Sequence, residues 1–184
     1  MESLNKKLEE KKIGGFTFSN NESLENYLSI FYASFLINSH LFIIGPPRVG
    51  KTSSSNFFSE LLKNNENNYI FFPFHRNTIS EFKAQTMERY KGPLIESALK
   101  GWIFIADEMN LSSIPTMKSI VPFLGPLLNK NILLPGLDDP IDIKDDFFFI
   151  VCQNNFDNLG RNTVSEILQR KLRNINYPKQ TKKK

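Results

Sequence analysis

The chain has 184 residues and a hydrophobic fraction of 40%, which suffices for one domain with a sizeable core and excludes two domains of ordinary size. The net charge of +4 owes much to the lysines of residues 179–184, so the remainder is nearly neutral and nucleic-acid binding has little electrostatic support. A single cysteine, Cys152, excludes an internal disulfide and fits a reducing compartment.

The start of the chain is polar and charged, and the one stretch with membrane-like composition, residues 27–44, is interrupted by polar residues. We therefore expect a soluble, intracellular protein without a cleaved signal and without a membrane partner. We divide the chain into an N-terminal extension over residues 1–12, a folded core over residues 13–178 and a basic tail over residues 179–184.

Helices and strands are predicted to alternate along the first part of the chain. Apolar residues from Leu24 to Phe35 recur at helical spacing and follow polar cap candidates, which predicts an amphipathic helix. Residues 41–44 and 69–74 are short apolar segments of the kind found inside a parallel sheet. Residues 52–63, between these two strands, are compatible with a helix.

The same alternation continues further along. Pro93 suits the first position of a helix that runs to Lys100, and residues 102–106 form the next buried strand. This order of elements predicts a right-handed, doubly wound α/β sheet. The elements expected after it are a helix that starts near Ser112 and is broken by Pro122, Gly125 and Pro126, a hairpin of residues 131–134 and 141–143, a strand over residues 147–152, a helix over residues 163–171 and an extended segment over residues 174–177.

A phosphate-binding motif lies between the first predicted strand and the helix that follows it. Residues 45–52 read G-x-x-x-x-G-K-T, and the glycines let the backbone curl so that N–H groups point at phosphate. Lys51 can then reach the outer phosphates, the hydroxyl of Thr52 can bind Mg²⁺, and the helix adds the positive end of its dipole. An ordinary glycine-rich turn is the alternative. The expected nucleotide-binding residues are Gly45, Pro46, Pro47, Arg48, Val49, Gly50, Lys51, Thr52 and Ser53.

Acidic and amide side chains follow two later strands. Asp107 and Glu108 come directly after residues 102–106, and Asn154 follows the strand over residues 147–152. Because the carboxyl ends of parallel strands share one edge, Asp107 can approach the phosphates and act on Mg²⁺, directly or through its water. Glu108 can polarise the attacking water as a general base, and Asn154 can hold the γ-phosphate or the water without adding charge. For the Asp-Glu pair, an acidic turn that caps the next helix is the alternative.

The joint order of these motifs resembles the AAA+ ATPases of the dynein-related, midasin-like branch. The resemblance extends over most of the chain, from about residue 41 to residue 178. It rests on the G-P-P-x-x-G-K-T loop at residues 45–52, H-x-x-T at residues 75–78, G-P-L-I-E-S-A-L at residues 92–99, D-E-x-N-L at residues 107–111, Q-N at residues 153–154 and G-R at residues 160–161.

The resemblance implies a fold and a set of ligands. The fold would be a phosphate-loop NTPase core, a mostly parallel five-stranded sheet flanked by helices, with a β-hairpin before the last core strand and a helical lid that is missing or truncated. The ligands would be ATP and Mg²⁺, with hydrolysis of the ATP. The partners would be other AAA+ modules, assembled with this one in a ring that remodels macromolecules.

The resemblance also implies roles for particular residues. Lys51 and Thr52 match the phosphate and metal positions of the Walker A loop. Asp107 and Glu108 match the metal-binding and catalytic acids of Walker B, and Asn154 matches the sensor asparagine.

Lys171 stands at the position of the family's arginine finger, with Arg170 and Arg173 beside it, and which of the three acts as the finger stays open. A lysine keeps the charge but lacks the planar fork that grips two phosphate oxygens, so a basic helix end is the alternative for this segment. The Walker residues and Asn154 favour the first functional hypothesis, an ATPase module. The lysine at the finger position favours the second, a nucleotide-binding scaffold with little or no turnover. GTP in place of ATP stays open, whereas a phosphate-loop kinase is disfavoured because Glu108 beside Asp107 suits water activation better.

Overall fold

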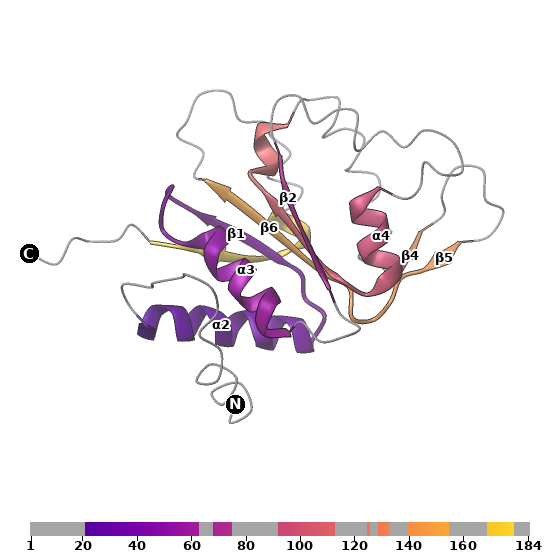
Figure 1. Ribbon diagram of the computed structural model, residues 1–184, viewed down its shortest axis with the longest axis horizontal. Helices are drawn as coiled ribbons and strands as arrows, with labels where there is room; N and C mark the ends of the chain where they lie inside the picture. Colours follow the sequence, from indigo (N-terminus) through magenta and orange to yellow (C-terminus); the bar gives the residue numbers. More distant parts are fainter. Residues whose placement is uncertain are drawn as a thin grey trace, which may run out of the picture.

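The centre of the protein is a parallel sheet of five strands in the order β2-β3-β6-β1-β7 (Figure 1). The computed structural model of the protein describes residues 21–62, 68–74, 92–112, 125, 129–132, 140–154 and 169–178. The strands are β1 (Leu41–Gly45), β2 (Tyr69–Pro73), β3 (Ile103–Asp107), β6 (Phe148–Asn154) and β7 (Arg173–Asn176). All four strand pairings are parallel, so the carboxyl ends of the five strands meet at one edge.

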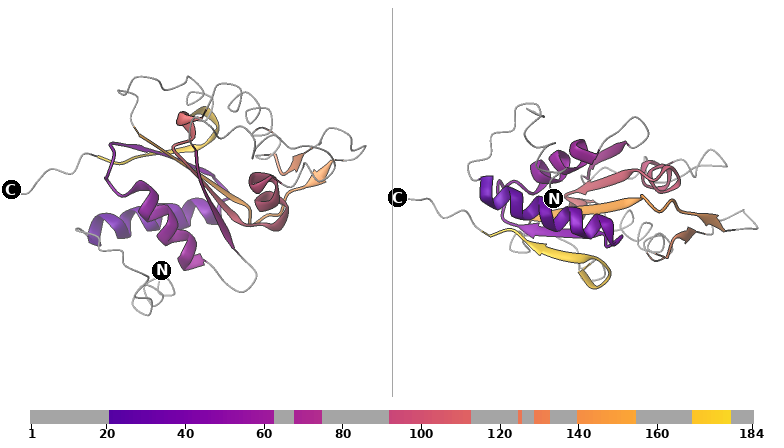
Figure 2. Two further views of the ribbon diagram at one scale, coloured as in Figure 1. Left: turned by 45° about the horizontal axis from the view of Figure 1, so that its top comes forward. Right: turned by 90° about the horizontal axis from the view of Figure 1, so that it is seen from below.

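Helices cover both faces of the sheet, as a doubly wound arrangement requires (Figure 2). Helices α2 (Asn21–Leu36) and α3 (Lys51–Leu62) pack on one face, and α4 (Pro93–Lys100) packs on the other. A short 3-10 turn, η2 (Met109–Leu111), follows β3. In the part of the chain that the structure describes, every helix is too short or too polar to cross a bilayer.

Alternation along the strands creates a hydrophobic core on each face. In β1, Phe42 faces the α4 side, whereas Leu41 and Ile43 face α2 and α3. Many of the 17 phenylalanines serve this packing: Phe31 of α2 meets Phe58 of α3 edge to face, with ring centroids 5.6 Å apart. Cys152 is completely buried and is a small core residue.

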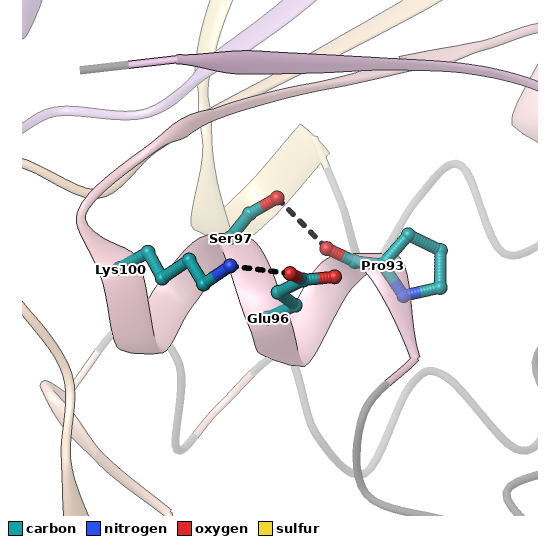
Figure 3. A network of polar contacts seen from close by, with 4 residues as sticks. All are labelled: Pro93, Glu96, Ser97 and Lys100. Atoms are coloured by element: carbon teal, nitrogen blue, oxygen red, sulfur yellow. Dashed lines mark hydrogen bonds and ion pairs between the residues drawn. The ribbon is translucent and has the colours of Figure 1, made fainter. Parts of the chain in front are cut away.

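Helix α4 shows how local sequence sets the bounds of an element. Pro93 occupies its first turn, and Gly101 ends it in the left-handed conformation with φ of 72°, donating its N–H to the carbonyl of Ser97. Lys100 pairs with Glu96 one turn earlier at 2.6 Å, and the Ser97 hydroxyl donates to the Pro93 carbonyl (Figure 3).

The expectation that residues 69–74 lie inside the sheet is wrong, because β2 is an edge strand. Phe71 is 38% exposed, and Pro73, which has no N–H to donate, is tolerated at an edge. An apolar run cannot distinguish an edge strand from an interior one, since both carry side chains that pack on a core.

The other predicted elements agree with the structure wherever it describes them, with ends shifted by a residue or two. The hairpin is an antiparallel pair of β4 (Asn131–Ile132) and β5 (Ile141–Asp142) that precedes β6. Its turn, the broken helix after Ser112, residues 163–168 of the last predicted helix and the H-x-x-T and G-R motifs lie outside the described residues. The proposed domain boundaries stay predictions.

His40 is a buried titratable residue that joins three strands. Its Nδ1 accepts a hydrogen bond from the Phe149 N–H at 3.2 Å, and its carbonyl accepts one from the Arg173 N–H at 2.8 Å. Burial, and secondarily the charge of Lys130, lowers the pKa of His40 to about 4. The neutral imidazole is therefore the form that the fold requires.

Stability should fall as the pH drops from about 6.5 towards 4, because the unfolded chain binds a proton on His40 that the folded chain excludes. The loss amounts to about 3 kcal/mol at most. His40→Asn keeps an acceptor oxygen but does not titrate, so its urea-unfolding free energy should be lower at pH 7 and much flatter over this window. If the unfolding free energy of both proteins changed equally with pH, His40 would not be the group responsible.

Candidate functional site

The phosphate loop connects β1 to α3 at the carboxyl edge of the sheet. Its turn uses two residues in the left-handed region, Arg48 with φ of 64° and Gly50 with φ of 94°. Helix α3 begins at Lys51, so its first N–H groups, which have no partner within the helix, lie at this loop. The Gly50 carbonyl is already engaged, because it accepts from both the N–H and the hydroxyl of Ser54 at 2.8 Å. A helix start behind a tight glycine turn is the backbone arrangement that binds anions.

Lys51 is 5% exposed, and its ammonium is held by three acceptors. It donates to the carbonyl of Gly45 at 3.0 Å, to the carbonyl of Pro46 at 2.7 Å and to Oδ1 of Asn154 at 2.9 Å. Pro46 has no N–H, so it contributes a carbonyl to the site rather than a donor to phosphate.

Asp107 and Thr52 meet across the site. The Thr52 hydroxyl donates to Oδ1 of Asp107 at 2.8 Å, which joins the first turn of α3 to the end of β3. Burial raises the pKa of Asp107, while the Thr52 hydroxyl, the Lys51 charge and the Glu108 N–H act in the opposite direction. A hydroxyl beside a partly desolvated carboxylate is an oxygen pair of the kind that Mg²⁺ binds, so the residues present fit this ion.

Glu108 and Asn154 form the second contact between strand ends. The side-chain amide of Asn154 donates through Nδ2 to Oε1 of Glu108. Glu108 has left-handed backbone with φ of 52°, and its N–H donates to the Cys152 carbonyl at 2.9 Å, which fixes the acid beside β6. Asn154 therefore contacts Lys51 with its oxygen and Glu108 with its nitrogen.

The structure brings together most of the residues that the sequence nominated, with one exception. The loop, Asp107, Glu108 and Asn154 share the carboxyl edge. Lys171 precedes β7, whose first residue pairs with Leu41 at the start of β1, so Lys171 lies at the opposite edge. Four residues of strand, roughly 13 Å, separate the two edges. The Lys171 ammonium lies next to Gly125 and not next to the phosphate loop.

Two tyrosines that no sequence motif indicates as site residues lie next to the loop. Tyr177, just after β7, donates its N–H to the Ile44 carbonyl at 2.7 Å and packs directly on Gly45. The ring of Tyr27 from α2 stacks on the Tyr177 ring, with centroids 3.8 Å apart. The contact of Tyr177 with Gly45 arises because β7 lies beside β1. This pairing joins distant parts of the chain, so no local motif indicates either tyrosine.

A glycine turn after β1, a buried lysine at the start of α3 and an acid at the end of β3 define the class of phosphate-loop α/β proteins. Within this class, the chain belongs to the AAA domain family of the dynein-related subfamily, whose profile matches residues 40–172. Among curated protein sequences, none matches the chain.

Solved structures share the fold at low sequence identity. A protein from Cytophaga hutchinsonii assigned as an ATPase has a TM-score of 0.58 at 15% identity, over 86% of this chain and 47% of its own. NtrX from Brucella abortus, solved in complex with ATP, has a TM-score of 0.54 at 17% identity, over 95% of this chain and 41% of its own. The complex of NtrX with ADP has a TM-score of 0.54 at 18% identity, over 95% of this chain and 39% of its own. The chain thus spans less than half the length of these structures.

Gly45→Ala should destabilise the fold by about 1–3 kcal/mol, because the added Cβ would lie 2.7 Å from both Cβ and the carbonyl oxygen of Tyr177. Chemical denaturation measures this cost. Gly92→Ala is the matched control: among the described residues nothing lies within 4 Å of its added Cβ, and we expect about 0.5 kcal/mol for a changed helix cap. Similar costs at both sites would show that the contact with Tyr177 is unimportant.

Proposed function

We propose that this chain is a Mg²⁺-dependent module that binds and hydrolyses ATP and that works in a ring of AAA+ modules to remodel macromolecules. The observation that carries the proposal is the Thr52–Asp107 hydrogen bond, because it brings a loop hydroxyl and a strand-end carboxylate to one point. The family assignment supports nucleotide binding by the same segment.

The phosphates would be held by the loop, residues 45–53, with Lys51 and the first N–H groups of α3 as donors. Thr52 and Asp107 would hold Mg²⁺, which would supply positive charge against the negative charge that develops on the phosphates. Partial burial raises the pKa of Asp107 because the charged carboxylate is poorly solvated there. A bound cation would offset this cost by pairing with the carboxylate.

Glu108 would act as the general base that accepts a proton from the attacking water. Its carboxylate is held in place by the Asn154 amide, at the end of a strand that turns through a left-handed residue. Asn154 would orient the water or the γ-phosphate by hydrogen bonds. Lys171 lies at the far edge of its own sheet, so its charge would act on the site of a neighbouring module.

A nucleotide-binding scaffold with little or no turnover is the second candidate function. The lysine at the finger position favours it, because an ammonium cannot grip two phosphate oxygens in the bidentate manner of arginine. GTP is an alternative ligand for either function.

Wild type and two variants test these functions. Wild type should bind Mg-ATP; Lys51→Ala should lose binding, because the chief cation for phosphate is removed; and Glu108→Gln should bind ATP within about threefold of wild type but release phosphate about 100-fold more slowly. Calorimetric titration with ATP and GTP and a phosphate-release assay measure these effects. Glu96→Gln is the control and should match wild type, because it changes a partly exposed carboxylate on α4, which packs on the opposite face of the sheet from α3.

Binding by wild type without phosphate release, even at high protein concentration, would favour the scaffold. Binding that survives Lys51→Ala would contradict the assignment of the loop itself.

A further inference from the structure

Each of the three N–H groups of the Lys51 ammonium has an acceptor. Two acceptors, the carbonyls of Gly45 and Pro46, belong to the loop that carries the lysine, and the third, Oδ1 of Asn154, belongs to β6. A phosphate oxygen can therefore accept from Lys51 only in exchange for one of these contacts. Asn154 lies on the side of the two acids, where phosphate would be held next to the Thr52–Asp107 pair.

The orientation of the Asn154 amide is fixed by its two neighbours. An ammonium can only donate and a carboxylate can only accept, so Oδ1 must face Lys51 and Nδ2 must face Glu108. The reversed amide would place like partners together on both sides. Asn154 is thus a preoriented acceptor for Lys51, and a hydrogen bond to a charged group is worth more than an ordinary one.

We propose that Asn154 is a specificity-determining residue that competes with phosphate for Lys51 and thereby weakens binding of a nucleoside diphosphate more than binding of the triphosphate. The inference rests on the proposed function and assigns Asn154 a role in product affinity in addition to contact with the γ-phosphate. A diphosphate must displace the amide with a single terminal phosphate. A triphosphate offers Lys51 a second phosphate and offers the displaced amide an oxygen to which Nδ2 can donate.

The test compares the affinities of Mg-ADP and of a non-hydrolysable Mg-ATP analogue by calorimetric titration. Asn154→Ala should bind ADP about threefold to tenfold more tightly than wild type, because the competing acceptor is gone. The analogue should bind no more tightly, so the preference for triphosphate falls. Asn154→Leu, which keeps the branched shape of the side chain without a donor or an acceptor, should behave alike. Asn176→Ala, an exposed asparagine on β7, is the control and should leave both affinities unchanged.

If Asn154 had a merely structural role, both substitutions would loosen the site and weaken the binding of ADP and of the analogue alike. The inference is overturned if wild type binds ADP and both Asn154 variants bind it equally or more weakly, or if both ligands tighten by the same factor. Failure of the proposed function looks different, because wild type then binds neither ligand.

Discussion

A lysine ammonium that is almost fully removed from water is costly unless every N–H meets an acceptor. For Lys51, those acceptors come from two segments about one hundred residues apart, the phosphate loop and the end of β6. The buried charge thus fixes the loop to the sheet. If β6 slipped by one residue against β1, Asn154 would turn to the other face of the sheet and Lys51 would lose its contact with β6.

Parallel pairing explains why the acids arrive at the same place. Gly45 of β1 pairs with Asn154 of β6, and Cys152, two residues earlier on β6, pairs with Asp107 of β3. Two links then cross the site: α3 reaches Asp107 through Thr52, and it reaches Glu108 through Lys51 and Asn154. In the proposed function, the first link serves the metal and the second serves the water. Adjacent acids with different partners can thus take different chemical roles.

The direction of the strands also places different charged residues at the two edges of the sheet. The carboxyl edge carries the loop and the acids, whereas the amino edge carries Lys171 and the buried His40. A positive charge at the amino edge cannot serve the phosphates of its own loop, so cooperation between modules would require the two edges to face each other. The chain spans less than half the length of the solved structures that share this fold, which leaves ring assembly and the remodelled substrate as proposals.

Short-range patterns determined much of this protein. The G-x-x-x-x-G-K-T spacing and the apolar strands predict the loop and the order of elements, because each depends on neighbours within a few residues. The cluster of Lys51, Thr52, Asp107, Glu108 and Asn154 then follows from the rule that parallel strands end at one edge of the sheet. Tertiary structure alone decided that β2 is an edge, that Gly45 must be small because Tyr177 packs on it, and that Asn154 bridges a cation and an anion. Those features depend on strand order and register, which are set by the packing of side chains distant in sequence and leave no local periodicity to read.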